Sequence, residues 1–311
     1  MNRYQKLLTR IEDGEKILID GATGTEMQRN GVPQLTNAWN GGGALTHPNI
    51  LKDVHKKYIL AGSEVIISNT FATHRQALHD AKVVENFKQL NHRGIEIATQ
   101  ARAETEKTNV LVAGGVSYWS WLETPCLPEL NTLEEDVRDQ VRIMADAGAD
   151  LIMLEMMVDI KRTIVCLEAA QSCGLPTWVG LSCKPNKDGE IMLGVNGGGV
   201  FAEGEPLHDA LEVIDSYNIP VVNIMHTEVE DISACINVIH KIWPSHFGVY
   251  AHSAQWSGSN DSCIFDGTIS PHDYSIHARR WLQDGAQIIG SCCGTNVKHI
   301  DELKLLLQTS Q

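Results

Sequence analysis

The stretch Ile288-Ile289-Gly290-Ser291-Cys292-Cys293-Gly294-Thr295 joins a short apolar run to two adjacent cysteines. Neighbouring side chains on a regular strand point to opposite faces. Both thiols can face one metal ion only if the backbone leaves its regular path, which the flanking glycines permit. Thiolates suit zinc, and a catalytic zinc typically has three protein ligands and one open position. We interpret Cys292 and Cys293 as two such ligands; the alternatives are inert core thiols or a strained vicinal disulfide.

This apolar run is the last of eight, and a segment with helical periodicity follows each of them. The runs are rich in Val, Ile and Leu, as strands buried on both faces should be. The predicted strands are Lys16–Asp20, Glu64–Ser68, Val110–Gly114, Asp150–Glu155, Thr177–Ser182, Pro220–Met225, Phe247–Ala251 and Gln287–Gly290. The predicted helices are Pro48–Ala61, Val83–Thr105, Leu133–Ala147, Ile160–Ser172, Leu207–Tyr217, Val229–Ile242, Pro271–Asp284 and Val297–Leu307.

Eight strand–helix units in 311 residues predict a (β/α)8 (TIM) barrel, an α/β fold. The competing architecture is an open doubly wound sheet, which rarely uses so many evenly spaced units. No shift in composition marks a second domain. We therefore expect residues 1–311 to form one barrel domain.

Composition narrows the classes of function. A net charge of -14 argues against nucleic acid and against an anionic membrane surface as partners. No apolar run is long enough to span a bilayer, and the N-terminus does not resemble a signal peptide. Eight cysteines without framework spacing predict reduced thiols and a cytoplasmic location. We expect small-molecule substrates and no nucleotide cofactor, since dinucleotide and P-loop fingerprints are missing; homo-oligomer formation is left open.

Reactive side chains follow the predicted strands at the end where barrel enzymes place their chemistry. They include Asp20, Thr25, Glu26, Tyr118, Trp119, Glu155, Cys183, His226, Tyr250 and His252, besides the cysteine pair. The other cysteines (Cys126, Cys166, Cys173, Cys235 and Cys263) are expected on helices or loops, without a special role. Two glycine clusters, Gly41-Gly42-Gly43 and Gly197-Gly198-Gly199, are interpreted as mobile loops over the site or as ordinary surface loops.

Three motifs resemble the homocysteine S-methyltransferase family, the zinc-dependent barrel that includes betaine–homocysteine methyltransferases. They are the opening segment Ile19–Glu26, the carboxylate segment Asp150–Glu155, and a closing pattern. The closing pattern comprises Ser270-Pro271, Tyr274, Trp281 and then Gly285 through Thr295. The resemblance covers roughly Lys16 to Leu305, and the order and spacing of the motifs fit one barrel.

The resemblance implies that Zn2+ binds the thiol of homocysteine, whose sulfur then takes a methyl group from sulfur or nitrogen to form methionine. Residues Asp20, Gly21, Thr25, Glu26 and Glu155 would hold the polar end of the amino acid, with Asp20 and Glu155 as catalytic carboxylates. Tyr250 and His252 are further candidates for substrate binding. For Glu155, the alternative is a salt-bridged carboxylate at a strand end.

The sequence departs from the family after the sixth strand. The family carries Gly-x-Asn-Cys there, with the cysteine as third zinc ligand, whereas this chain reads Asn223-Ile224-Met225-His226. We expect His226 to replace that ligand, since catalytic zinc sites with two cysteines and one histidine exist. The alternative is that His226 only forms a hydrogen bond near the site. Cys183 is another candidate for the replacement ligand.

A second departure follows the seventh strand, where the family's Tyr-x-Asn reads Tyr250-Ala251-His252. His252 is a candidate fourth ligand or general base. An imidazole in place of a thiolate also makes the metal site one charge less negative. Substrate thiolate should then bind more tightly and be less nucleophilic, which suits a more reactive methyl donor or a different substrate.

The methyl donor is suggested by aromatic residues near the strand ends. Tyr118, Trp119, Trp121, Trp39 and Tyr250 are candidates to bind a cationic donor, because aromatic faces attract quaternary ammonium and sulfonium groups. Such donors include a betaine, S-methylmethionine or another sulfonium; the alternative is that these rings only pack the loops. Two other functions remain open: demethylation or methylation of another acceptor, and thiol or metal binding without catalysis.

Overall fold

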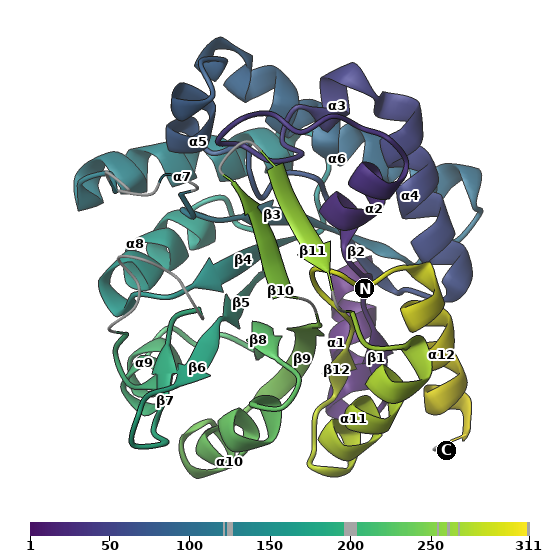
Figure 1. Cartoon of the computed structure of the whole chain (residues 1–311), viewed down its shortest axis with the longest axis vertical. Helices are drawn as coiled ribbons and strands as arrows, with labels where there is room; N and C mark the ends of the chain where they lie inside the picture. The colour runs from purple at the N-terminus through teal and green to yellow at the C-terminus, as the bar shows by residue number, and fades with distance from the viewer. Residues whose placement is uncertain are drawn as a thin grey trace.

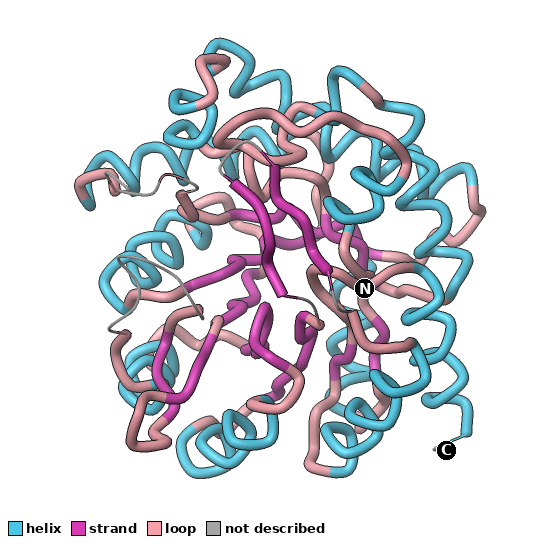
Figure 2. Tube along the Cα trace, viewed as in Figure 1, coloured by secondary structure: helices cyan, strands magenta, loops and turns pink. Residues whose placement is uncertain are grey.

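The protein is a closed barrel of parallel strands surrounded by helices, as seen in a computed structural model (Figures 1 and 2). The structure describes residues 1–120, 122, 127–195, 204–253, 255–259, 262–266 and 268–309, and only the backbone of 255–259 and 262–266. Eight strands pair in the order β1-β12-β9-β8-β5-β4-β3-β2. A parallel bridge between Ile19 and Val65 joins the first and last strands of that order. The predicted TIM barrel is therefore confirmed.

The barrel strands are short, and their residues are almost all buried because helices cover the outer face and side chains fill the interior. Their bounds are β1 (Ile17–Leu18), β2 (Val65–Ile67), β3 (Leu111–Val116), β4 (Leu151–Met157), β5 (Thr177–Leu181), β8 (Val221–Glu228), β9 (His246–His252) and β12 (Ile288–Ile289). Two antiparallel hairpins were not predicted: β6 (Cys183–Pro185) with β7 (Ile191–Leu193), and β10 (Gln255–Ser259) with β11 (Ser262–Asp266). Cys263 therefore lies in a strand, and not on a helix or loop as expected.

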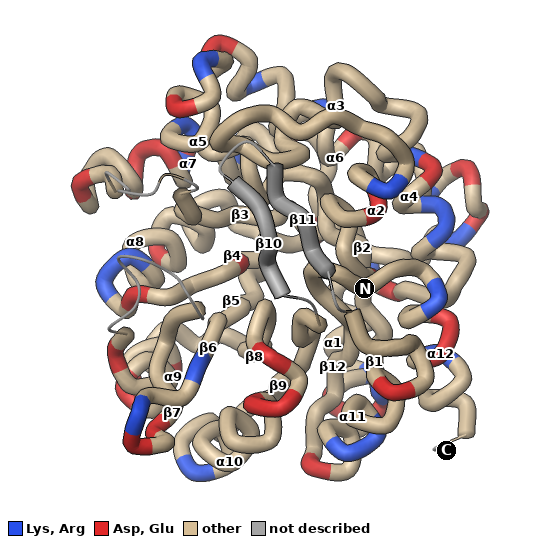
Figure 3. The backbone as a smooth tube through the Cα atoms, in the orientation of Figure 1, with Lys and Arg blue, Asp and Glu red and all other residues tan. Residues whose placement is uncertain are grey.

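Helices form the outer layer, and the charged residues in Figure 3 lie mainly along them. They are α1 (Arg3–Glu12), α2 (Thr23–Arg29), α3 (Gly43–Thr46), α4 (Pro48–Ala61), α5 (Arg75–Asp80), α6 (Phe87–Glu104), α7 (Leu130–Asp146), α8 (Ile160–Gln171), α9 (Leu207–Asp215), α10 (Ile232–Ile242), α11 (Pro271–Gln283) and α12 (Val297–Thr309), with a 3-10 turn at Val84–Asn86. None of the helices in the described residues is long and apolar enough to cross a membrane.

Helix α1 covers the amino-terminal end of the barrel. The indole N–H of Trp178, near the start of β5, donates to the Tyr4 hydroxyl at 3.1 Å. The Gln287 side chain, just before β12, donates to the Ile11 carbonyl at 3.1 Å. These contacts anchor α1 to the beginnings of the strands. The reactive side chains gather at the opposite, carboxyl-terminal end of the barrel, as is usual for this fold.

Four barrel strands extend beyond their predicted ends, toward the carboxyl-terminal rim. Strand β3 reaches Val116, β4 reaches Met157, β8 reaches Glu228 and β9 reaches His252. In β4 and β8 the register with the next strand shifts near the end, and Met156 and His226 have positive φ angles of 53° and 44°. Such irregularities re-aim side chains at strand ends and often lie beside functional sites.

Candidate active site at the carboxyl end of the barrel

The loop after β12 turns the two adjacent cysteines toward each other. A Cβ atom on Gly290 would lie 2.3 Å from Cγ1 of Ile19, and Gly294 has a φ angle of 82°, so both positions require glycine. The Sγ atoms of Cys292 and Cys293 are 3.8 Å apart. A disulfide bond is about 2.05 Å long, and both cysteines are free thiols. The vicinal disulfide is therefore not the state found here.

Helix α2 holds this loop in place. The Arg29 guanidinium donates to the carbonyl oxygen of Gly294 at 2.5 Å and also to that of Thr295. The Gly294 N–H donates to the Thr25 hydroxyl at 3.2 Å. Arg29 was not predicted as a site residue; the available signal was its position three residues after Glu26, with which it forms an ion pair at 2.9 Å.

His226 meets the cysteines from β8. Its Nδ1 lies 3.6 Å from Sγ of Cys292, and the ligand atoms of His226, Cys292 and Cys293 all lie within 4.8 Å of one another. Burial, followed by the neighbouring His252, lowers the pKa of His226 well below its usual value. The imidazole is therefore neutral, which is the form that binds a metal ion.

Two of the three distances between these ligand atoms fit a tetrahedral zinc ion. Zinc–sulfur and zinc–nitrogen bonds of about 2.3 and 2.05 Å place tetrahedral S···S and S···N pairs about 3.8 and 3.6 Å apart. The distances found are 3.8 and 3.6 Å. Cys183 is not in this group, and its buried thiol has a pKa raised by burial and by Cys235. Among the described residues, the third donor beside the cysteines is His226.

Two buried carboxyl groups lie near the donors. Asp20 follows β1, and its Oδ2 accepts the Ile67 N–H at 2.8 Å. Glu155 lies on β4, and its Oε2 would be 2.7 Å from a Cβ atom added to Gly115. Burial raises the pKa of Glu155 to about 8, and burial together with Glu155 raises the pKa of Asp20. The salt-bridged alternative is not found, since Glu155 has no cationic partner within the described residues.

Three further predicted site residues, Gly21, Thr25 and Glu26, lie beside the loop that carries the cysteines. Gly21 is close to Ser291 and Tyr58, whose side chains would lie 3.0 Å from an added Cβ. Thr25 accepts a hydrogen bond from the Gly294 N–H, and Glu26 forms an ion pair with Arg29, which itself binds the carbonyls of the cysteine loop. Both residues therefore stabilise that loop.

Tyr250 and His252 extend from β9 on one face, two residues apart. A Cβ atom added to Gly180 would lie 2.5 Å from the Tyr250 hydroxyl, so the Tyr250 side chain points into the barrel. Burial, followed by Glu155, raises its pKa well above the usual value. The Nε2 of His252 lies 3.0 Å from a Glu228 oxygen, and the rings of His252 and His226 have centroids 4.3 Å apart.

Two of the candidate aromatic residues, Tyr118 and Trp39, pack within the fold. Tyr118 is buried, and its hydroxyl accepts the Val158 N–H at 3.0 Å, which is a structural role. Trp39 packs on α2, where a Cβ on Gly24 would be 2.4 Å from its ring. Trp121 lies outside the described residues. Tyr250 is close enough to Glu155 and Asp20 for both to contribute to its raised pKa, after the larger effect of burial.

Of the two glycine clusters, the structure describes only Gly41-Gly42-Gly43. Gly41 is buried, with the Ala72 carbonyl oxygen 2.7 Å from an added Cβ, and Gly43 begins α3. This cluster is therefore tightly packed and is not a loose loop. Gly197-Gly198-Gly199 and Cys126 lie outside the described residues.

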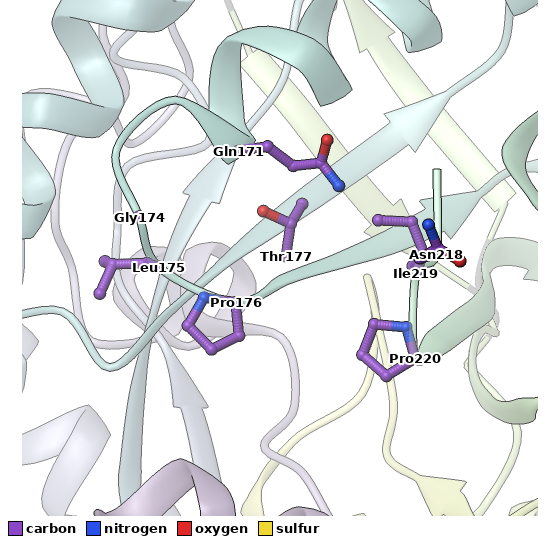
Figure 4. Close-up of a pocket in the computed structure, with 8 residues that line it drawn as sticks. All are labelled: Gln171, Gly174, Leu175, Pro176, Thr177, Asn218, Ile219 and Pro220. Atoms are coloured by element: carbon purple, nitrogen blue, oxygen red, sulfur yellow. The ribbon is translucent and has the colours of Figure 1, made fainter. Parts of the chain in front are cut away.

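A shallow pocket is found at the opposite end of the barrel (Figure 4). It lies where the chain enters β5 and β8, and it is lined by Gln171, Gly174, Leu175, Pro176, Thr177, Asn218, Ile219 and Pro220. None of these residues is an acid, base or nucleophile at neutral pH. This pocket therefore offers no chemistry comparable to that of the rim.

The family comparison covers almost the whole chain. The sequence model described as "Homocysteine S-methyltransferase" matches residues 17–307. Homocysteine S-methyltransferase 1 of Zea mays is 25% identical over 315 residues, covering 94% of each chain. Selenocysteine Se-methyltransferase of Brassica oleracea var. italica is 24% identical over 312 residues, covering 91% of this chain and 86% of the relative.

A solved structure shows the same fold. The metallated form of the homocysteine methyltransferase MmuM from Escherichia coli superposes with a TM-score of 0.77, at 21% identity, covering 98% of this chain and 99% of that one. With the family match over residues 17–307, the conclusion is that this chain belongs to the homocysteine S-methyltransferase family and is a methyltransferase.

Proposed function

We propose that the protein is a zinc-dependent S-methyltransferase that moves a methyl group from a cationic donor to the thiol of homocysteine, giving methionine. The observation that carries this proposal is the grouping of His226, Cys292 and Cys293 at tetrahedral spacing, beside the buried carboxyls of Asp20 and Glu155. Neither feature alone defines the reaction. Together they offer a place for a sulfur atom and a place for an ammonium group.

In this proposal, His226, Cys292 and Cys293 would hold the zinc ion through Nδ1 and the two Sγ atoms. The metal would supply deprotonation of the substrate thiol at neutral pH, because a coordinated thiol loses its proton. The loop contacts of Arg29 and Thr25 keep both cysteines on the same side of the backbone. The protein thereby fixes the position of the nucleophilic sulfur before the donor arrives.

The amino-acid end of homocysteine would bind at Asp20 and Glu155. In the empty site, burial raises the pKa of both carboxyl groups, and Glu155 raises that of Asp20 further, which favours their protonated forms. An incoming ammonium group favours the ionised form of a carboxyl group, so binding releases a proton and creates a charge-assisted hydrogen bond. Gly21 leaves room for the side chains of Ser291 and Tyr58 beside the site, while Thr25 and Glu26 support the loop that carries the cysteines.

The chemical step is a direct displacement. A sulfur lone pair forms the new S–C bond to the methyl carbon, and the bond from that carbon to the donor's sulfur or nitrogen breaks. Its electron pair returns to the donor atom, which loses its positive charge. A betaine, S-methylmethionine or another sulfonium satisfies this balance, and the ring of Tyr250 is the candidate to face its cationic centre.

The decisive experiment combines metal content with product formation. We expect purified protein to hold about one zinc ion per chain and to form methionine from homocysteine with at least one donor of a cationic panel. Cys292→Ala and Cys293→Ala should lose both metal and turnover, whereas Cys173→Ala, at a half-buried cysteine outside the site, should keep both. Undiminished turnover in protein freed of metal would contradict the proposal.

A different acceptor is favoured by one observation, the similarity to plant enzymes named for selenocysteine. The acceptor panel should therefore include selenocysteine and cysteine beside homocysteine. A cytoplasmic location is also proposed, in keeping with the free state of the described cysteines.

A further inference from the structure

The bulge near the end of β4 contains one of the residues that the proposed function assigns to the substrate ammonium. Strand β4 pairs with β3 as far as Leu154, and its pairing with β5 passes from Leu154 to Met157. Glu155 and Met156 therefore lie outside both ladders, and Met156 has a left-handed φ angle of 53°. This conformation needs support from neighbouring groups, because a bulge leaves backbone groups without ladder partners.

The support comes from Met225 on β8, which is 2% exposed. Its Sδ lies 3.1 Å from the Met156 backbone N and accepts that N–H, and it also accepts the Ser182 hydroxyl at 3.3 Å. A thioether is a weak acceptor, but both donors are buried, so the sulfur fills the place of a strand carbonyl. Gly180 makes room for this side chain, since a Cβ atom there would lie 2.9 Å from Cγ of Met225.

This hydrogen bond bears on the direction of the Glu155 side chain. The Met156 N–H belongs to the planar peptide group that begins at Cα of Glu155. Holding that N–H in place therefore restricts the orientation of the Cα–Cβ bond from which the carboxyl group extends. The carboxyl group lies over β3, where its Oε2 would be 2.7 Å from a Cβ atom added to Gly115. Without the sulfur, the Met156 N–H would turn toward another acceptor and carry the carboxyl group away from this position.

We propose that Met225 is a positioning residue, whose thioether holds the β4 bulge so that the Glu155 carboxyl group meets the ammonium of the amino-acid substrate. This role rests on the proposed function, in which that carboxyl group binds the ammonium. Met225 acts through one backbone N–H and not on the substrate. Its effect should therefore fall on the amino-acid end of the substrate and spare the sulfur end.

The test compares two probes on the zinc-loaded, full-length protein by calorimetry. Homocysteine carries the ammonium group, whereas 4-mercaptobutyrate is the same thiol acid without it. Met225→Leu keeps the volume and removes the acceptor. We expect it to weaken homocysteine binding about tenfold, the scale of one hydrogen bond to a charged group, and to change 4-mercaptobutyrate binding less than about threefold. Met144→Leu, at a buried methionine on α7 that packs against Gly114, is the matched control and should change neither.

A double-mutant cycle tests whether Met225 acts through Glu155. In a Glu155→Gln background, Met225→Leu should weaken homocysteine binding less than about threefold, because the charged group that it positions is gone. A further loss of about tenfold in that background would overturn the inference. Equal weakening of both probes by Met225→Leu alone, or an unchanged affinity for homocysteine, would overturn it as well.

Met225→Gln keeps an acceptor oxygen on a side chain of similar length, and it is the second variant should thermal unfolding or zinc content show that the leucine protein is misfolded. It should bind homocysteine within about threefold of the wild type. A loss as large as that caused by Glu155→Gln would contradict the positioning role. Methionine formation by the wild type upholds the proposed function whichever of these results is found. A wild type that makes no methionine and binds both probes equally would overturn the proposed function, and with it this role of Met225.

Discussion

Replacing Glu155 with glutamine should stabilise the protein and impair substrate binding. The carboxyl group is 8% exposed, and burial raises its pKa from 4.5 to about 8. The folded state therefore keeps a proton that the unfolded chain releases once the pH exceeds about 4.5. Because the folded pKa is the higher one, Glu155 lowers stability progressively as the pH rises from about 4.5 to about 8.

The magnitude follows from the size of the shift. Each pKa unit corresponds to about 1.4 kcal/mol, so this penalty is about 3 kcal/mol near pH 7 and about 5 kcal/mol above pH 8. Glutamine has nearly the same volume and no charge to bury. We therefore expect Glu155→Gln to match the wild type near pH 5 and to exceed its free energy of unfolding by about 3 kcal/mol near pH 7.

The assay is urea unfolding of zinc-loaded wild type and variant at about pH 5, 7 and 8.5, with Glu12→Gln as a control on an exposed glutamate. The same variant should raise the KM for homocysteine about tenfold to a hundredfold, since an amide cannot form a charge-assisted bond to ammonium. Parallel pH profiles for wild type and Glu155→Gln would refute the burial argument. An unchanged KM would refute the proposed role in substrate binding.

Two other variants test the loop and the outer layer. Arg29→Gln should loosen the carbonyls of Gly294 and Thr295 and weaken zinc binding about tenfold, the effect of a lost outer-shell partner; competition with a chelator measures this, and an unchanged affinity would contradict it. His55→Leu should stabilise the protein by about 1–3 kcal/mol near pH 7, because both ring nitrogens are buried without partners in the described structure. Burial also lowers the pKa of His55 to about 4, so the wild type should lose about 3 kcal/mol as the pH falls from about 6.5 to about 4, a loss that His55→Leu removes in urea titrations.

The barrel was predictable because its strands are apolar runs buried on both faces, and those runs alternate with amphipathic segments. Helix α4, for example, spans Pro48–Ala61 as predicted, with proline in its first turn and Gly62 at its C-cap with a φ angle of 113°. The hairpins β6–β7 and β10–β11 were missed because each interrupts a connection that carries no strong alternation of apolar and polar residues. Their formation depends on pairing partners that a local pattern does not reveal.

Strand order placed Cys292, Cys293 and His226 on one rim, since residues at the carboxyl ends of barrel strands lie together, and the resemblance to the family singled out His226 as the third ligand. The loop contacts of Arg29 could not be predicted, because its partners are backbone carbonyls 265 and 266 residues away along the chain. A carbonyl acceptor has no signature in the sequence. For the same reason, the pairing of Glu228 with His252 depends on a register shift that only the folded sheet defines.

The two departures from the family pattern lie on adjacent strands and touch each other, so they are coupled in space. An imidazole at position 226 leaves the metal site one charge less negative than three thiolates would, which favours tight thiolate binding over nucleophilicity. A less nucleophilic sulfur would need a donor held close and in line, and His252, which is paired with Glu228 and lies against His226, would be one more point of attachment for such a donor. On this argument, the second substitution compensates for the first, and His252→Phe should be more harmful with His226 present than in a His226→Cys background.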